Sequence, residues 1–260
     1  MAFQTAKYGW IPDIPDHRDH LYGAPIRTLQ TLPPSVDLTA KCPAVYDQGQ
    51  IGSCTANAIG AALEFDRMKQ GLPDFMPSRL FIYYNERAME HTIGSDSGAQ
   101  IRDGVKSVGK QGDCPETEWP YDPSPAQDNK LLTKRPTPQC YKDAKKYTAV
   151  QYQRVDQSLA QMKGCLAAGS PIIIGFTVYE SFETPSVART GHARLPESGE
   201  RAVGGHAVIA VGYDDARERF LARNSWGSRW GMSGYFTMPY AYLIQPGLTA
   251  DLWTIRLVGP

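Results

Sequence analysis

The stretch Asp47-Gln48-Gly49-Gln50-Ile51-Gly52-Ser53-Cys54-Thr55-Ala56-Asn57-Ala58 decides how the rest of the chain is interpreted. A glycine-rich turn runs directly into a cysteine, and the cysteine opens an alanine-rich stretch that continues to Gln70. Apolar residues occur on nearly every face of its first three turns, which predicts a buried helix rather than one laid on the surface. Gly71 and Pro73 are expected to end this helix.

Cys54 therefore lies at the first turn of a buried helix. Unsatisfied N–H groups and the helix dipole favour an anion at that end, so the pKa of a thiol there is expected to fall. The thiolate is the nucleophilic form of cysteine, which predicts a reactive residue. The alternative is a small core residue, since free cysteines are commonly buried. This stretch alone leaves both interpretations open.

Composition sets broad limits. The chain has 260 residues, enough for one large domain or two smaller lobes. Its 27 basic residues equal its 27 acidic ones, so we expect neither a nucleic-acid nor a membrane-surface partner. No apolar run approaches the ~20 residues of a membrane span, and residues 1–10 do not resemble a signal peptide. Localisation stays open between the cytoplasm and a secretion route that the sequence does not reveal.

Cysteine usage also leaves alternatives. An odd count of five fits one reactive thiol, and the other four could form two disulfides or none. The segment His17-Arg18-Asp19-His20 is better explained as a solvated polar turn than as a metal site, because no companion ligands stand out. We therefore expect no metal and no cofactor.

Helices are expected first along the chain and strands afterwards, which predicts an α+β architecture. Ser78 is expected to cap a helix that runs to about Met89, and a third helix carries Ile101, Val105 and Val108. Asp156 is expected to cap a later helix that ends at Gly169. Residues 115–138 are expected to form an extended connection. The predicted strands are 172–178, 203–213, 219–223, 234–238 and 252–257.

Two stretches in the second half carry further chemistry. Gly204-Gly205-His206 places a histidine at the mouth of an apolar strand, and Arg223-Asn224-Ser225-Trp226 places an asparagine where another strand ends. A histidine beside a thiol can take its proton, and an amide on the far ring nitrogen fixes the tautomer. Singly, His206 could be a hydrogen-bonded core residue, Asn224 a turn former and Trp226 core filler. Together with Cys54 they predict a thiol nucleophile with its base.

The order and wide spacing of Cys54, His206 and Asn224 resemble the papain family of cysteine peptidases. The resemblance covers roughly residues 32 to 257. The stretches that carry it are Gln48-Gly49-Gln50-Ile51-Gly52-Ser53-Cys54, Gly205-His206-Ala207-Val208, Asn224-Ser225-Trp226-Gly227-Ser228-Arg229-Trp230-Gly231, Leu32-Pro33-Pro34-Ser35-Val36-Asp37-Leu38 and Trp119-Pro120-Tyr121. Within the family, the Gly9-Trp10-Ile11-Pro12-Asp13 segment and the Asp47–Gln50 turn look most like bacterial members.

The resemblance implies a fold and roles for single residues. The fold would be papain-like, with a helical N-terminal lobe, a β-barrel-like C-terminal lobe and the active site in the cleft between them. Cys54 would be the nucleophile, His206 the general base and acid, and Asn224 the residue that orients His206. Trp226 would shield the His206–Asn224 hydrogen bond from water, and Gln48 would donate to the oxyanion.

Substrate-binding residues are also implied by the resemblance. Ser97, Gly98 and Ala99 fall where the family has a strand with paired glycines that binds the substrate backbone. Ile101, Gly175 and Ala207 would line the subsite for the residue two positions before the scissile bond (P2). None of these three is charged, which predicts an apolar or aromatic P2 residue and, for the chain as a whole, an endopeptidase.

This sequence also departs from the family pattern. Thr55 follows the nucleophile where the family usually has tryptophan. Ile51 and Asp96 stand where the family usually pairs two cysteines. Cys42 could pair with Cys114 instead, but free thiols are an equal alternative.

The first 31 residues form a proline-rich arm that precedes the body. It carries too much apolar surface for a solvated tail, so we expect it to lie against the body, either across the active site or as a strap on the back. The predicted divisions are an arm at 1–31, a mainly helical lobe at 32–150 and a mainly β lobe at 151–260.

The favoured function is a monomeric thiol protease that acts on protein or peptide substrates through an acyl-enzyme. A transpeptidase or amidase on the same fold is the second hypothesis. A non-catalytic binding module is the third.

Overall fold

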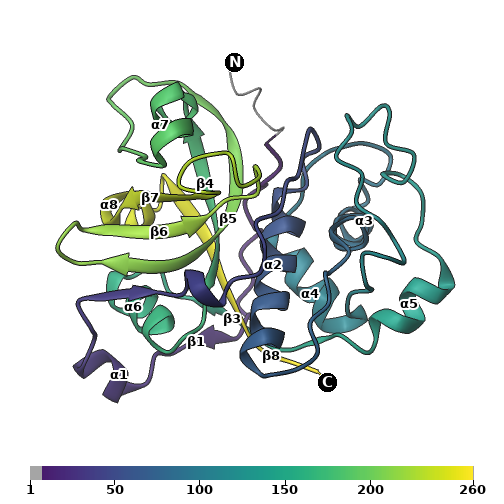
Figure 1. Cartoon of the computed structure of the whole chain (residues 1–260), viewed down its shortest axis with the longest axis horizontal. Coiled ribbons are helices and arrows are strands. Elements are labelled where there is room, and N and C mark those ends of the chain that lie inside the picture. Colours follow the sequence, from purple (N-terminus) through teal and green to yellow (C-terminus); the bar gives the residue numbers. More distant parts are fainter. Residues whose placement is uncertain (1–7, 260) are drawn as a thin grey trace.

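A computed structural model describes residues 8–259 of the chain. Its elements fall into a helical portion and a sheet portion, drawn on opposite sides of Figure 1. Those before residue 145 are β1 Leu21–Tyr22, α1 Ile26–Gln30, β2 Ser35–Asp37, η1 Thr39–Lys41, α2 Cys54–Lys69, α3 Arg79–Met89, α4 Ile101–Gln111 and α5 Pro138–Ala144. Those after it are β3 Ala149–Val155, α6 Leu159–Ala167, β4 Ile172–Tyr179, η2 Glu180–Glu183, α7 Pro185–Thr190, β5 Ala202–Asp214, β6 Arg219–Arg223, β7 Tyr235–Pro239, α8 Tyr240–Ile244 and β8 Thr249–Val258.

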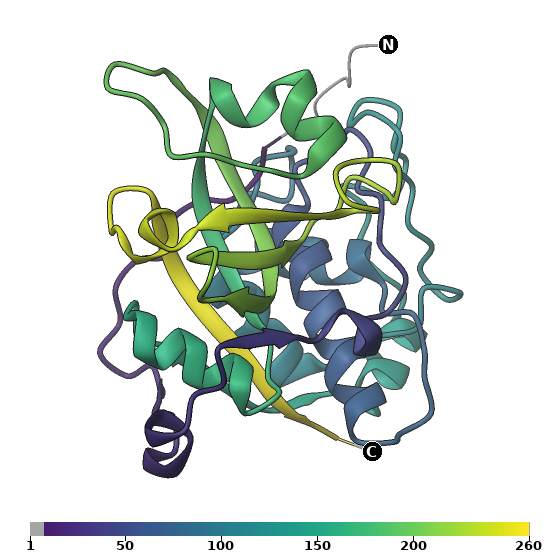
Figure 2. The same ribbon diagram turned by 60° about the vertical axis from the view of Figure 1, so that its left-hand side comes forward.

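One twisted sheet organises the second half of the chain. Its order is β1-β3-β8-β4-β5-β6-β7, and β2 pairs with β5 outside this path. All pairings are antiparallel except that of β1 with β3. The turned view in Figure 2 shows β8, in yellow, running through the middle of the sheet. The α+β prediction is confirmed.

Helix α2 is the element that joins the two portions. It packs against β5 and β8 of the sheet and against α3 and α4 of the helical portion. Every side chain from Cys54 to Arg67 is buried, so the prediction of a buried helix from its apolar residues is confirmed. Because α2 is held on all sides, the cysteine at its first position has a fixed place in the molecule.

Several local expectations were inaccurate. The side chain that caps α6 is Ser158, which accepts a hydrogen bond from the Gln161 N–H, and not Asp156. The predicted strands omitted β3, whose residues alternate poorly between buried and exposed. The predicted helices omitted α5, which begins at Pro138 and has seven residues. Among residues 8–259, no helix is both long and apolar enough to cross a bilayer.

The cysteines are all free, including the pair that the sequence left open. Cys42 lies beside Tyr235 and Arg223, and its thiol donates to the Leu38 carbonyl. Cys114 lies beside Cys140 in the helical portion instead. Cys42 and Cys114 are therefore not partners.

Candidate active site

The glycine-rich turn places Cys54 next to β5 of the sheet. Gly49 has φ 59°, and a Cβ there would come within 2.2 Å of the Pro123 carbonyl oxygen, so only glycine fits at this point of the turn. The backbone N–H groups of Ala207, in β5, and of Gly9, in the arm, both point at the Cys54 sulfur. Ala207 follows His206 directly. The structure thus brings the predicted nucleophile and the predicted base together from opposite halves of the chain.

His206 and Asn224 form a closely defined pair. The His206 Nε2 lies 2.8 Å from the Asn224 Oδ1, and the backbone N–H of Ser225 also donates to that Oδ1 at 2.8 Å. Because the Asn224 oxygen is identified by the Ser225 donor, it must accept from the imidazole, which places the proton of a neutral His206 on Nε2. Nδ1 is then the basic nitrogen, and it has no hydrogen-bond partner among the described residues.

Aromatic rings enclose this pair. The Trp226 ring stacks on His206 with centroids 4.8 Å apart and an interplanar angle of 27°. Phe176 packs edge-on against the same imidazole from β4. His206 is fully buried and Asn224 is 2% exposed, so their hydrogen bond is kept from bulk water.

Gln48 links the turn to the sheet beside this pair. Its Oε1 accepts from the Ser225 hydroxyl at 2.7 Å, and its Nε2 donates to the Ile51 carbonyl at 3.0 Å. Its backbone N–H donates to the Ser225 carbonyl at 2.8 Å. Since Oε1 faces a hydroxyl donor, the amide nitrogen is turned toward the Ile51–Cys54 side of the turn.

The arm lies directly over Cys54. The Trp10 N–H donates to the Gly205 carbonyl at 2.9 Å on the sheet side. On the helical side, the Ala99 N–H donates to the Gly9 carbonyl at 2.7 Å and the Ile11 N–H to the Ala99 carbonyl at 3.0 Å. The segment Tyr8–Ile11 thus bridges the two portions as an added strand, parallel to residue 99. Figure 1 shows the chain entering between the two portions at this point.

The Trp10 side chain occupies the place predicted for P2. Its ring lies so close to Gly175 that a Cβ there would come within 2.1 Å of it, and it also lies against Gly205. Its Nε1–H donates to the Asp251 Oδ2 at 3.1 Å. The indole is thus held between glycines, with a carboxylate at its far edge.

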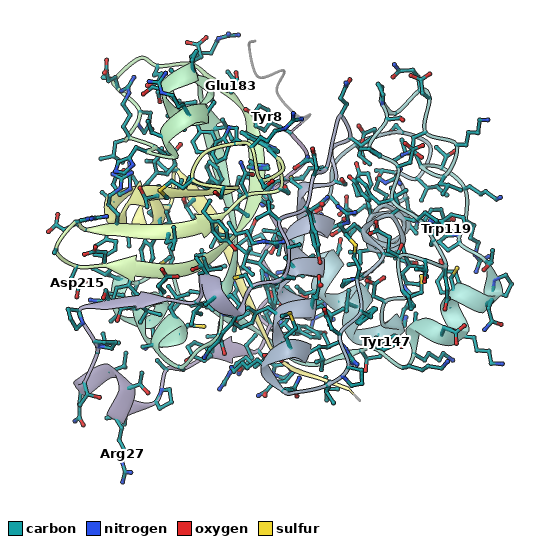
Figure 3. The ribbon with its side chains drawn as sticks, in the orientation of Figure 1. Tyr8, Arg27, Trp119, Tyr147, Glu183 and Asp215 are labelled. Atoms are coloured by element: carbon teal, nitrogen blue, oxygen red, sulfur yellow. The ribbon has the colours of Figure 1, made fainter. Side chains whose placement is uncertain are left out.

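Tyr8 covers the histidine side of the site. Its ring lies 6.0 Å from the His206 ring and 6.2 Å from the Trp226 ring. Its hydroxyl donates to the Glu183 Oε1 at 2.5 Å, and Figure 3 shows the two labelled side chains together beside the sheet portion. Cys54 is consequently fully buried under the arm.

This cover changes the ionisation of the reacting groups. Burial raises the pKa of the Cys54 thiol to about 12, even though the N–H groups of Ala207 and Gly9 favour the thiolate. Burial also lowers the pKa of His206 to about 4. The sequence predicted a lowered pKa for the thiol, but exclusion of water by the arm outweighs the helix N-terminus. Burial beneath the arm thus favours the neutral forms of both the thiol and the imidazole.

The predicted substrate-binding residues differ in what they contact. Ala99, Gly175 and Ala207 border the arm or the sulfur, as described above, and Gly98 also lies against the arm, where a Cβ would come within 2.3 Å of the Gly9 carbonyl oxygen. Ser97 turns its hydroxyl to Thr92 Oγ1 at 2.8 Å. Ile101 is the first residue of α4 and is fully buried. Sequence reasoning missed Asp251 and Glu183, since an isolated acidic residue carries no local signal of a partner so far away in the chain.

Polar contacts replace two features that the sequence lacks. The Gly52 N–H donates to both oxygens of Asp96, at 3.0 and 3.1 Å, and so ties the two segments that a disulfide would otherwise join. Thr55 donates its hydroxyl to the Glu86 Oε2 at 2.9 Å. Burial raises the pKa of Glu86 well above its ordinary value, which favours a neutral acid beneath the first turn of α2.

Comparisons with known proteins agree with this geometry. Residues 32–248 match the family model described as papain family cysteine protease. A peptidase C1-like protein of Acanthamoeba polyphaga mimivirus, itself uncharacterised, is 41% identical over 98% of this chain and 88% of its own length. The crystal structure of xylellain, a cysteine protease from Xylella fastidiosa, superimposes with a TM-score of 0.91 at 48% identity and covers 96% of each chain. Procathepsin B of Trypanosoma congolense shares the fold at TM-score 0.69 and 19% identity, covering 85% of this chain and 77% of its own. The papain-like fold is confirmed.

Proposed function

The chain belongs to the papain family of cysteine proteases, and from this premise we propose that it cleaves peptide bonds with Cys54 as nucleophile. The family shows that the chain is a cysteine-type peptidase, whereas the catalytic roles of single residues are our proposal. The observation that supports this assignment is the His206–Asn224 pair, which leaves Nδ1 as the basic nitrogen of His206. The next residue, Ala207, points its backbone N–H at the Cys54 sulfur.

The proposed reaction has two halves. His206 Nδ1 takes the Cys54 proton as the sulfur attacks the substrate carbonyl, and then gives it to the leaving amine. Water then hydrolyses the acyl-enzyme with His206 as base. The Cys54 backbone N–H and the Gln48 side-chain amide stabilise the oxyanion. Asn224 orients the imidazole and Trp226 keeps water from their hydrogen bond.

We propose an endopeptidase that prefers an apolar or aromatic residue at P2. Support comes from Trp10, an aromatic residue of the chain itself, whose ring lies on Gly175 where that side chain would bind. Asp251 adds an acceptor for an aromatic residue with a donor at its edge. Ser97, Gly98 and Ala99 would bind the substrate backbone, with Ile101 and Ala207 beside the subsite. A panel of substrates that differ only at P2 tests this, and a preference for glutamate would contradict it.

We also propose that the arm is autoinhibitory. The arm forms hydrogen bonds with the backbone of Ala99 and Gly205, which a bound substrate would otherwise use. It also places the Trp10 side chain in the proposed P2 subsite. Residues 1–7 of the arm lie outside the described residues. The proposed units are the arm at 1–31, a mainly helical lobe at 32–150 and a mainly β lobe at 151–260. The protein would act as a monomer on protein or peptide substrates.

The test is titration with a thiol-directed epoxide that requires an activated cysteine. We expect one label, at Cys54, together with turnover of dipeptidyl amide substrates, both faster in a chain that begins near Leu32. Labelling without hydrolysis would favour a transpeptidase or amidase. No labelling of the shortened chain would remove Cys54 from its proposed role.

A further inference from the structure

Two cysteines that the proposed catalysis does not use lie side by side in the helical portion. Cys114 follows the end of α4 and Cys140 lies in α5, and they are 0% and 1% exposed. The thiols and the carboxylate of Glu118 form a group whose ligand atoms all lie within 4.8 Å of one another. Glu118 itself is exposed, so the group opens to the surface on one side.

The other cysteines outside the active site have different surroundings. Cys165 donates to the Ser170 carbonyl at 3.5 Å and Cys42 to the Leu38 carbonyl at 3.5 Å, each without a second thiol beside it. Cys114 and Cys140 instead form a pair within a small apolar cluster that includes Trp119, labelled in Figure 3. Packing alone explains single buried cysteines, but it does not explain two thiols converging on a carboxylate.

A buried acidic residue without a hydrogen-bond partner lies next to this group. Asp113, next to Cys114, is fully buried, and neither of its carboxylate oxygens has a hydrogen-bond partner among the described residues. The nearby cations are already committed, since Arg79 pairs with Glu116 at 2.8 Å and Lys146 with Asp143 at 2.5 Å. A bound cation would give the buried Asp113 carboxyl the partner that these two pairs do not provide.

We propose that Cys114, Cys140 and Glu118 bind a thiophilic divalent metal ion of the zinc class. Thiolates at ~2.3 Å and a carboxylate oxygen at ~2.0–2.2 Å suit Zn²⁺ in a tetrahedral site, and a water molecule would complete the set. A shared tetrahedral metal places its two sulfurs somewhat under 4 Å apart, so the side chains need only small shifts from the separation observed. Two thiol protons leave as two metal–sulfur bonds form, and no electron is transferred.

The metal would fasten a long connection. Between α4 and α5 the chain has no helix or strand, and Cys140 already touches the turn that holds Glu118 through the Glu118 carbonyl, at 3.8 Å. Thr137, which caps α5, lies 3.1 Å from the Cys140 sulfur and can steady it as a ligand. The site would therefore hold α5 against the turn and close the loop between Cys114 and Cys140.

Cobalt titration of the full chain carrying Cys54→Ala tests this, because the nucleophile is then unable to bind the metal. We expect one Co²⁺ per chain with sulfur-to-metal charge-transfer absorption, its displacement by Zn²⁺, two protons released per metal and a higher Tm. Cys140→Ser should abolish the signal. Glu118→Gln, at an exposed position that should not affect folding, should weaken binding at least about tenfold.

Cys165→Ser is the matched control, since it removes a buried thiol that lies alone, and binding should persist. The proposal is overturned if no stoichiometric Co²⁺ binds, or if binding survives both Cys140→Ser and Glu118→Gln. It is also overturned if protein prepared under reducing conditions carries a Cys114–Cys140 disulfide, two mass units lighter and without metal.

Discussion

The two halves of the arm contact the body through different interactions. We call Tyr8–Ile11 the cover, since it lies on Cys54 with three backbone hydrogen bonds and the Trp10 ring. We call residues 13–22 the anchor, which is held by ion pairs and by the pairing of β1 with β3. In the anchor, Asp19 pairs with Arg102 at 2.6 Å and lies near Lys106 and Arg154.

We infer from this difference that the cover blocks the site and the anchor attaches the arm to the body. The cover uses interactions that a substrate could replace one for one, so a substrate can compete with it. The anchor uses charges on α4 and β3, away from the reacting atoms, which no substrate needs. We propose that the cover opens while the anchor stays attached to the body, with Asp251, which accepts from both Trp10 and the Asp13 N–H, as the point where the two meet.

The cover can block catalysis only if the residue beneath it, Cys54, is the nucleophile. The largest expected loss of activity is therefore caused by substitution of Cys54. In a chain opened by removal of the arm, Cys54→Ala should lower kcat/KM by on the order of 10⁴-fold or more. Asn224→Ala should lower it less, because an orienting residue only improves geometry. Steady-state kinetics on a dipeptidyl amide decide this, and unchanged turnover by Cys54→Ala would refute the mechanism.

Gln48 belongs to the turn that leads into Cys54 and is bonded to Ser225 and Ile51, not to the anchor's ion pairs. Gln48→Ala should lower kcat by about 10²-fold in the opened chain, the usual loss for one oxyanion donor. Its effect on KM should be small, because the bond is needed in the transition state. An unchanged kcat would remove Gln48 from the proposed site.

Gly9, in the cover, and Gly23, which directly follows the anchor, allow the same substitution to be compared at the two ends of the arm. A Cβ at Gly9 would come within 1.8 Å of the Gly52 carbonyl oxygen, whereas nothing lies within 4 Å of one at Gly23. Gly9→Ala should therefore lift the cover and raise kcat/KM of the full chain by at least about tenfold, while Gly23→Ala leaves it unchanged. Equal rates for both variants would mean that Tyr8–Ile11 does not limit access.

Asp19→Asn addresses the anchor. The Asp19 side chain is 3% exposed and three cations face it. Its neutralisation takes the ion pair from the buried Arg102, whereas Lys106 keeps Asp16 and Arg154 keeps Asp251. We expect Tm to fall by several degrees, since about 1 kcal/mol shifts the Tm of a chain near this size by roughly 2–4 °C. Activity should rise by less than in Gly9→Ala. A larger gain in activity than in Gly9→Ala would reverse the tasks assigned to the two halves.

The smallest expected effect is a pH dependence of closure. Burial, and then the charge of Asp251, raise the pKa of Asp13 to about 6, while Arg102 and Trp253 act in the opposite direction. The closed arm thus prefers protonated Asp13, so closure is strongest near pH 4 and weakens as pH rises through about 6. The kcat/KM of the full chain, divided by that of Gly9→Ala, should rise over this range. Asp13→Asn should flatten the rise.

The signals that predicted the candidate site are local. Cys54 follows a glycine turn and opens an alanine-rich helix, and Asn224 begins a long motif rich in tryptophan. The position of the cover was not predictable, because it depends on Gly175 and Gly205 leaving room for an indole and on Asp251 accepting its N–H. From the sequence we predicted only that the arm lies against the body, either across the active site or as a strap on the back.

The element errors have similar causes. Ser158, rather than Asp156, caps α6 because the chain turns two residues later than the apolar pattern indicated. β3 was missed because its polar sequence does not alternate between apolar and polar residues. Its pairing with β8 on one side and β1 on the other stabilises it as a strand. In both places distant partners, rather than the local sequence, decide the structure.

The place of β8 in the sheet has a consequence for synthesis. This strand, formed by residues 249–258, lies between β3 and β4, so the middle of the sheet stays open until those residues have left the ribosome. Asp251, which accepts from Trp10 and from the Asp13 N–H, arrives with the same strand. A nascent chain that stops short of β8 lacks both the finished sheet beside His206 and the acceptor that seats the arm. The enzyme is therefore completed and covered in the same step of translation.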